Sequence, residues 1–284
     1  MTNRKGTTVN GVQFQSQLVG AGPINKHGDG VLQVSHRSPL YSGTVTVYQG
    51  LLHATASALS NAAVVLMEDA QYTDALTLNT NFTTVILRGG ILLGEVVHYG
   101  VLEADGGGSV RPNFSRRIEH SRVTGTGTLT TPAGGYALAY CGVIAPGVSP
   151  SAAGTLAFDI GGGVQFAVGL TDAFATIEID ITGTGGVAGV DHDVVHISSL
   201  STFSPDVVHL IVHGASSEEV TNWFLTTQQP YSADAAFASV VFTDGEGEVI
   251  YDTDARRIGA IVVPEPGLWA ACAGLVLVRL KRRC

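Results

Sequence analysis

The sequence has little charge and few cysteines, and these shortages exclude several classes of protein. Charged residues make up only 14% of the 284 residues, whereas an average soluble domain has roughly 25%. The three cysteines, Cys141, Cys272 and Cys284, are scattered and form no C-x-x-C pair. This excludes a disulfide framework and a cysteine-ligated zinc site. The net charge of −9 argues against nucleic-acid binding, because such binding needs basic surfaces that neutralise phosphates.

Motifs for cofactor binding and nucleophilic catalysis are also missing. The glycine-rich segment Gly183-Thr-Gly-Gly-Val-Ala-Gly189 lacks the G-x-G-x-x-G register, and no helix is expected after it. The segment Gly147-Val-Ser-Pro-Ser151 has proline where a nucleophile elbow must begin a helix, and it has no closing glycine. We therefore predict a protein that is not an enzyme and that holds no cofactor and no metal.

What the sequence does contain is a succession of short strands and turns. Apolar or alternating segments recur about every ten residues up to about Leu170, each followed by a turn signal. The predicted strands include 30–34, 43–47, 63–66, 76–78, 84–87, 155–158, 175–182, 194–198, 207–212 and 238–242. Pro112–His120 is predicted to be a protruding loop. Ser216–Leu225, in which a serine precedes glutamates and an apolar run, is predicted to be a short capped helix.

The strand spacing fits either a sandwich or barrel, or a β-solenoid in which coils stack strand on strand. Two features favour the solenoid. Asn10-Gly11 is the only tight hairpin dipeptide of its type. A strand followed by glycine and further apolar residues also returns at 45–52, 85–93 and 139–147. Glycine at the corner of a coil lets the backbone turn without a Cβ clash.

The end of the chain has a separate character. Gly267–Val278 is apolar and uncharged, and four basic residues follow almost at once. This order is typical of a stop-transfer segment, although roughly 12 residues is short of the roughly 17 to 25 that spanning requires. The alternative is a buried strand or helix over Leu268–Leu280. The predicted anchor residues are Leu268, Trp269, Leu275, Val276, Leu277 and Val278, and the predicted basic stop is Arg279, Lys281, Arg282 and Arg283.

Val263-Pro-Glu-Pro266, the apolar stretch and the basic terminus together resemble the PEP-CTERM sorting signal of bacterial envelope proteins. The resemblance implies that Pro264, Glu265 and Pro266 form a sorting motif recognised by an exosortase. It also implies delivery to the cell surface or to an extracellular (biofilm) matrix, with a C-terminal transmembrane helix. The short apolar stretch, Leu280 within the basic cluster and the final Cys284 depart from the pattern.

The body of the chain resembles the autotransporter-associated β-strand repeat. The family pattern K-x-G-x-G-x-L-x-L, followed by Y-x-G-x-T-x-V-x-x-G-x-L, is matched by Lys26, Gly28, Gly30, Leu32, Val34, Tyr41, Gly43, Thr44, Val47, Gly50 and Leu52. Gly142–Pro150 is similar to the family's downstream turn. The resemblance covers much of residues 12 to 263, although only one repeat is close. It implies a right-handed parallel β-helix that is displayed on the surface and has no known catalytic site.

We therefore expect an all-β protein made of a right-handed parallel β-helix at 1–170, a β-rich capping region at 171–263 and a sorting and anchor tail at 264–284 that includes a short apolar helix. The expected function is structural or adhesive, at a bacterial cell surface or in its matrix. The exosortase, the membrane and a surface polysaccharide are the expected partners. The first residues lack the apolar core of a signal peptide, so we expect the true start to lie upstream of Met1.

Two chemical alternatives accompany this expectation. Asp191, His192 and His196 could supply metal ligands, but a strand there would keep the two histidines apart. In the repeat family an acid commonly lies in the loop before such a strand, so the resemblance implies that Asp193 is a structural acid.

The second alternative is a carbohydrate-active β-helix, a polysaccharide lyase or hydrolase that uses carboxylates in a groove along the coils. Its candidate residues are Glu68, Asp69 and Asp74, with Arg88, Arg116 or Arg117 as partners.

Overall fold

The computed structural model describes residues 11–55, 58–75, 84–94, 101–112, 116–130, 138–147, 152–160, 164–166, 175–183, 186–199, 203–215, 220–231 and 236–264. The first strands are β1 (Gly11–Phe14), β2 (Ile24–Lys26), β3 (Val31–Val34), β4 (Thr44–Thr55), β5 (Ala63–Ala75), β6 (Thr84–Gly94), β7 (Val101–Pro112), β8 (Arg116–Gly125) and β9 (Thr128–Thr130). They are followed by β10 (Leu138–Pro146), β11 (Thr155–Ile160), β12 (Val164–Phe166), β13 (Ala175–Asp180), β14 (Val194–Ser199), β15 (Val208–His213), β16 (Asn222–Thr227), β17 (Ser239–Phe242), β18 (Gly245–Asp252) and β19 (Arg257–Pro264). A single 3-10 turn, η1 (Pro205–Val207), precedes β15. The all-β prediction is confirmed.

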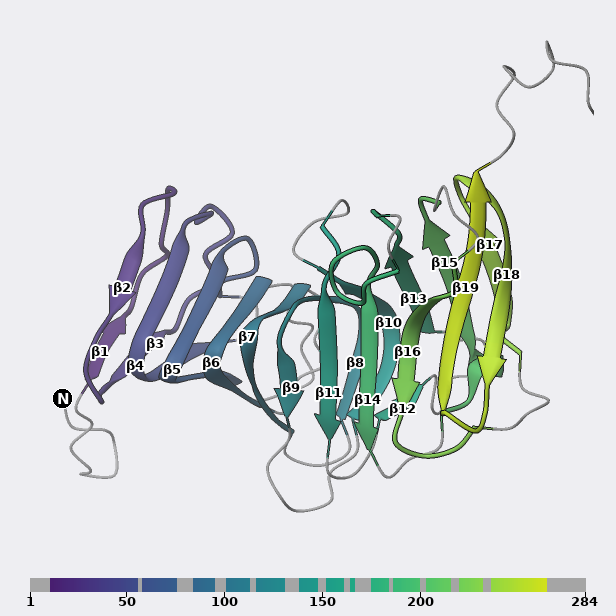
Figure 1. The fold of residues 1–284 in the computed structure, drawn as a ribbon. Helices are drawn as coiled ribbons and strands as arrows, with labels where there is room; N and C mark the ends of the chain where they lie inside the picture. Colours follow the sequence, from purple (N-terminus) through teal and green to yellow (C-terminus); the bar gives the residue numbers. More distant parts are fainter. Residues whose placement is uncertain are drawn as a thin grey trace, which may run out of the picture.

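Most strands pair in parallel with a strand that lies further along the chain, and the separation in sequence varies. Val31 pairs with Leu51, 20 positions on, and Ile177 pairs with Leu210, 33 positions on. Two long rows of strands result, and a short third row joins the first halves of β8 and β10 to β12. Sheet A contains β2, the first halves of β4 to β7, the second halves of β8 and β10, then β13, β15 and β17. Sheet B contains β1, β3, the second halves of β4 to β7, then β9, β11, β14 and β16. In Figure 1 the stack runs across the molecule from β1 and β2 at one side to β17, β18 and β19 at the other.

A continuous column of aliphatic side chains runs through sheet A, and we call it the aliphatic column. Its members pair in register, each with the next: Ile24, Val45, Val64, Val85, Leu102, Val123, Ile144, Ile177, Leu210 and Val240. Every member between the first and the last is fully buried, with at most 1% of its surface exposed. Stacking like on like across parallel strands therefore builds the core, at roughly 25 cal/mol for each Å² of apolar surface removed from water.

Glycines at the corners let successive strands approach each other closely. Gly50 adopts a φ of +77°, and a Cβ there would lie 2.6 Å from the carbonyl oxygen of Gly28 and 2.7 Å from that of Gly30. Gly43 is confined in another way, because a Cβ there would lie 2.6 Å from the Tyr41 hydroxyl. Steric crowding therefore explains why the second part of the repeat pattern, Tyr41–Leu52, has glycine at positions 43 and 50.

Two buried polar side chains in the N-terminal part of the molecule donate hydrogen bonds to backbone carbonyl oxygens. The Tyr41 hydroxyl donates to the carbonyl oxygen of Gly22 at 2.8 Å. Lys26 is 7% exposed. It donates to the carbonyl oxygens of Gln49 at 2.8 Å and His27 at 3.2 Å, and also to that of Gly28. Satisfying a buried donor in this way removes the penalty that an unpaired polar group would impose.

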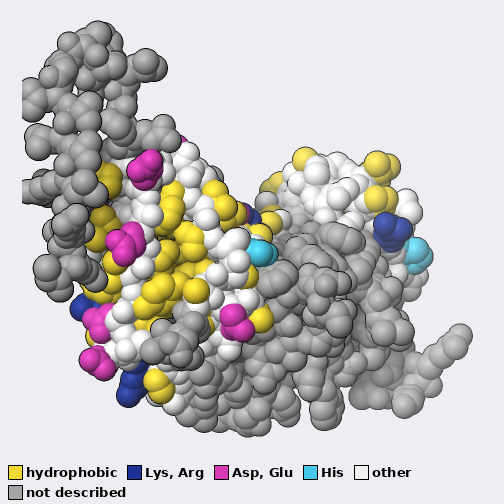
Figure 2. Space-filling model, turned by 90° about the vertical axis from the view of Figure 1, so that its right-hand side faces the viewer, with side chains coloured by type: hydrophobic (Ala, Val, Ile, Leu, Met, Phe, Trp, Pro, Cys, Tyr) yellow, Lys and Arg dark blue, Asp and Glu magenta, His cyan; other side chains and the backbone are white. Residues whose placement is uncertain are grey.

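The far end of the molecule is built differently from the rest. β19 pairs antiparallel with β16 and with β18, so sheet B ends in an antiparallel hairpin. Sheet A ends at β17, which pairs only with β15 among the described strands. Figure 2 views this end and shows apolar side chains gathered between acidic ones.

Most of the predicted strands are confirmed, and parallel pairing continues past residue 170 as far as Phe242. Two local predictions are wrong. The predicted loop Pro112–His120 overlaps β8, which begins at Arg116. The predicted helix Ser216–Leu225 overlaps strand β16, because Leu225 pairs with Val195 in sheet B. The predicted strand at 76–78 and the predicted apolar C-terminal helix lie outside the described residues. Within the described part of the chain, no helix has the length and apolar character needed to cross a membrane.

Substituting the corner glycines tests the close approach of neighbouring coils. Gly28 and Gly50 both have positive φ, +76° and +77°, but only Gly50 has atoms within 4 Å of an added Cβ. Gly28→Ala should cost about 1 to 2 kcal/mol from backbone strain alone. Gly50→Ala should cost at least about 2 kcal/mol more, because backbone atoms must shift. Urea unfolding midpoints measure both, and equal losses would contradict the steric argument.

Candidate functional site

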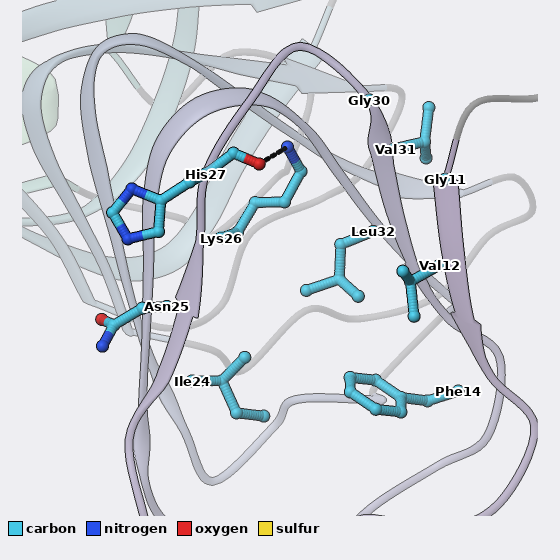
Figure 3. Close-up of a pocket in the computed structure, with 10 residues that line it drawn as sticks. All are labelled: Gly11, Val12, Phe14, Ile24, Asn25, Lys26, His27, Gly30, Val31 and Leu32. Carbon is cyan, nitrogen blue, oxygen red and sulfur yellow. Dashed lines mark hydrogen bonds between the residues drawn. The ribbon is translucent and has the colours of Figure 1, made fainter.

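A cavity of about 550 Å³ opens at the N-terminal end of the stack. Phe14, Ile24 and Leu32 point into it from β1, β2 and β3, whereas the His27 and Asn25 side chains point away (Figure 3). These are the same side chains that begin the apolar interior, so the cavity is the open mouth of the core. Its lining is apolar, as expected for a surface that another apolar group can cover.

Lys26 forms part of the cavity wall. Burial lowers the pKa of Lys26, and the nearby Asp29 opposes this shift. Its ammonium group donates hydrogen bonds to backbone carbonyl oxygens of two neighbouring turns. The side chain therefore fastens the corner.

The predicted metal ligands do not converge. The His192 side chain is buried, with Nε2 donating to the carbonyl oxygen of Trp223 at 3.2 Å. The His196 side chain is exposed, and its Nδ1 contacts the Thr226 hydroxyl. The Asp191 carboxylate accepts from the backbone amide of Val187 at 2.9 Å. In the described part of the chain, no group of three His, Cys, Asp or Glu side chains could hold a metal ion.

Asp193 ties three segments of the chain together. Its side chain is 1% exposed, with Oδ1 accepting from the amide of Gly154 at 2.7 Å and Oδ2 from the amide of Asp180 at 2.9 Å. Burial raises the pKa of Asp193 to about 7, and the two amide donors only partly oppose it. The sequence predicted this acid as a structural residue before the strand, and its contacts fit that role.

The carboxylates predicted for carbohydrate chemistry are dispersed. Glu68 and Asp69 are exposed at the bend of β5. Arg88 pairs with Asp105 at 2.7 Å, their side chains being 51% and 36% exposed, and such a surface pair contributes at most about 1 kcal/mol. The side chains of Asp74, Arg116 and Arg117 lie outside the described part of the structure. Nothing in the described geometry brings Glu68 or Asp69 to a basic partner.

A polar cluster that the sequence did not predict lies on the outer face of sheet A. Glu178 pairs with Arg122 at 2.6 Å, and Asp180 lies opposite His213 in the strand register. Burial raises the pKa of Asp180; His213 and Arg122 oppose this shift, and Glu178 adds to it. The His213 Nδ1 contacts the Thr243 hydroxyl at 3.2 Å. We call Arg122, Glu178, Asp180 and His213 the outer polar cluster.

The alternation in Ala175–Thr182 already placed Glu178 and Asp180 on one face of a strand. Their partners lie 56 positions upstream and 33 positions downstream, at Arg122 and His213. Only the strand register could bring these groups together, and the sequence does not reveal that register.

The predicted sorting and anchor residues from Glu265 to the end lie outside the described residues. Pro264 is the last described position and ends β19, where its backbone pairs with Gly245. The last described residues of the chain therefore lie in the hairpin at the far end. No family model, no curated protein and no solved structure matches this chain.

The raised pKa of Asp193 predicts a pH-dependent stability. The folded-state pKa of about 7 lies above the ordinary aspartate pKa of 3.8, so folding favours the protonated acid. The contribution of Asp193 to the free energy of unfolding is therefore largest below about pH 4. It decreases by up to about 1.4 kcal/mol per pH unit as the pH rises to about 7.

Comparing the wild type with Asp193→Asn isolates this dependence. The variant cannot ionise at this position, so its free energy of unfolding should rise relative to that of the wild type between pH 4 and pH 7. For a control substitution at an exposed acid, Asp159→Asn, the free energy of unfolding should change with pH in the same way as that of the wild type. If the difference for Asp193→Asn does not change with pH, the assigned pKa is wrong.

Proposed function

We propose that this protein is an exported, non-enzymatic structural or adhesive component of a bacterial cell surface or extracellular matrix. In this proposal its body is a right-handed parallel β-helix that acts as a stiff spacer. Its C-terminal tail directs it to the envelope, where an exosortase processes it. The observation that carries the proposal is the aliphatic column.

The column supports a rod-like body. Nine parallel steps link Ile24 to Val240, and strand spacing of about 4.8 Å gives a stack on the order of 43 Å. In such a stack each coil contacts chiefly its neighbours, so length can be set by the number of coils. A body of this kind separates its two ends by a fixed distance, which suits a spacer.

The polar groups in the interior support a structural role for the body. Lys26, Tyr41 and Asp193 are buried, and each makes hydrogen bonds to backbone groups of neighbouring turns. A catalytic group must instead reach a reacting molecule. The site where the chain departs, at Pro264 on the terminal hairpin, suits a body that is carried by its tail.

Tail-dependent processing tests the sorting proposal. The full chain, extended upstream with an export signal, would be produced in a bacterium with and without an exosortase. We expect a product shortened near Pro264 and located outside the cytoplasm only when the exosortase is present. Replacing Pro264, Glu265 and Pro266 by alanine should abolish the shortening. Intact mass and cell fractionation measure both, and an unshortened cytoplasmic product in every case would refute the proposal.

The outer polar cluster favours a second candidate function, that of a carbohydrate-active β-helix. A half-buried carboxylic acid whose pKa is raised by burial, beside a histidine, has the character of a general acid, and Asp180 meets that description. If this function holds, the protein should release reducing sugar from an acidic or neutral polysaccharide. Asp180→Asn should reduce the rate at least about 100-fold, whereas the exposed Asp206→Asn should leave it unchanged. No release from a broad polysaccharide panel would exclude this candidate.

A further inference from the structure

Two neighbouring turns near the N-terminal end of the stack contact each other through two pairs of side chains. One turn joins β2 to β3 and carries His27 and Asp29, and the other is the bend within β4 that carries Tyr48 and Gln49. The His27 and Tyr48 rings stack, with centroids 4.4 Å apart and planes 5° from parallel. The Gln49 amide donates to the Asp29 carboxylate. We call these four residues the aromatic corner.

The aromatic corner lies at the surface. His27 and Asp29 are exposed, Tyr48 is 42% exposed and Gln49 is half-buried. The His27 side chain points away from the N-terminal cavity (Figure 3). Among the large apolar side chains whose exposure the structure describes, Tyr48 is the one aromatic residue that is exposed. An aromatic ring kept at the surface beside hydrogen-bonding groups is typical of residues that contact a partner.

The backbone beneath the aromatic corner is fastened by one buried side chain. Lys26 donates to the carbonyl oxygens of His27 at 3.2 Å and Gln49 at 2.8 Å, and also to that of Gly28. It therefore ties both turns together from below. In the strand register Lys26 lies opposite Val47, which is fully buried, so the ammonium group takes a place that suits an apolar side chain. Fixing both turns preorganises the exposed side chains and lowers the entropy cost of binding.

The chemistry of the aromatic corner matches a sugar ring. A pyranose has an apolar face of C–H groups, which an aromatic ring such as Tyr48 can cover, and hydroxyl groups that donate and accept hydrogen bonds. The Asp29 carboxylate accepts hydrogen bonds, and the Gln49 amide both donates and accepts them. Asp69 lies opposite Gln49 in the next coil, next to Glu68, and both acids are exposed. These negative charges would repel an acidic glycan, so the site favours a neutral one.

We propose that the aromatic corner binds a neutral polysaccharide, with a sugar ring against the His27–Tyr48 pair and its hydroxyl groups bonded to Asp29 and Gln49. This inference rests on the adhesive part of the proposed function and gives it a site and a class of ligand. The corner lies at the opposite end of the stack from Pro264, which ends β19 (Figure 1). A body held through its C-terminal end would therefore present this site at its far end.

Binding of the purified full chain to immobilised polysaccharides, followed by surface plasmon resonance, tests the proposal. The panel contains neutral glucans, mannans, xylans and galactans, with alginate as the acidic polysaccharide. We expect at least one neutral polysaccharide to bind more tightly than alginate, and its binding to persist when salt is raised, because the contact pairs no opposite charges. Binding to none of the neutral polysaccharides, tighter binding to alginate, or loss of binding in high salt would overturn the proposal.

Matched variants assign the binding to the aromatic corner. Tyr48→Ala should weaken it about tenfold, whereas Tyr48→Phe, which keeps the ring, should stay within about threefold of the wild type. Asp29→Ala should weaken it more than Asp29→Asn, which keeps an oxygen acceptor. The control Leu40→Ala removes a side chain that is 70% exposed in the turn between β3 and β4, and it should change nothing. Equal effects of Tyr48→Ala and Leu40→Ala would overturn the assignment.

The urea unfolding midpoint of each variant is measured alongside its binding. Because Tyr48 and Asp29 are exposed, these midpoints should stay at the wild-type value, so that weaker binding reports lost contacts with the glycan. Glycan binding is measured on purified protein and requires no processing near Pro264. Failure of this site and failure of tail-dependent sorting therefore give different results.

Discussion

Register is the constraint on which the rest of this molecule depends. The aliphatic column exists only if each strand of sheet A lies opposite one particular set of residues in the next coil. A slip of one residue would turn every member of the column toward solvent. The corner at Gly50, with its positive φ, and the buried hydrogen bonds of Lys26, Tyr41 and Asp193 all act on this register. They fix where each strand begins relative to its neighbour.

Much of the fold could be predicted because its local signals are short-range. Alternating apolar residues and turn glycines predicted strands such as β6, β11 and β13, and the acid before β14 was expected to be structural. The spacing between coils could not be predicted. It is close to 20 positions in the first coils and 33 from Ile144 to Ile177. Residues inserted between the strands do not disturb the stacking of the aliphatic column. They do vary the number of residues between its members, so the sequence has no constant repeat length.

The failures have particular causes. The serine and glutamates before Trp223 satisfy a helix-capping pattern, yet sheet pairing of Leu225 with Val195 determines the outcome. Arg257 also stacks on the Trp223 ring at 3.9 Å, from the neighbouring antiparallel strand. In β8 the polar composition suggested a loop, but polar residues are tolerated in a strand that has one face outside the core. The outer polar cluster escaped prediction because its members meet only through the register of four strands.

The direction of the sheet hydrogen bonds has a mechanical consequence. In stacked parallel strands these bonds point along the axis of the stack, so tension between its two ends would open them one rung at a time rather than shear many at once. A load applied through Pro264 first meets its pair with Gly245, the outermost pair of the β18–β19 hairpin. Under pulling, that hairpin would peel before the aliphatic column is disturbed, and the terminal strands would act as a sacrificial element that protects the body.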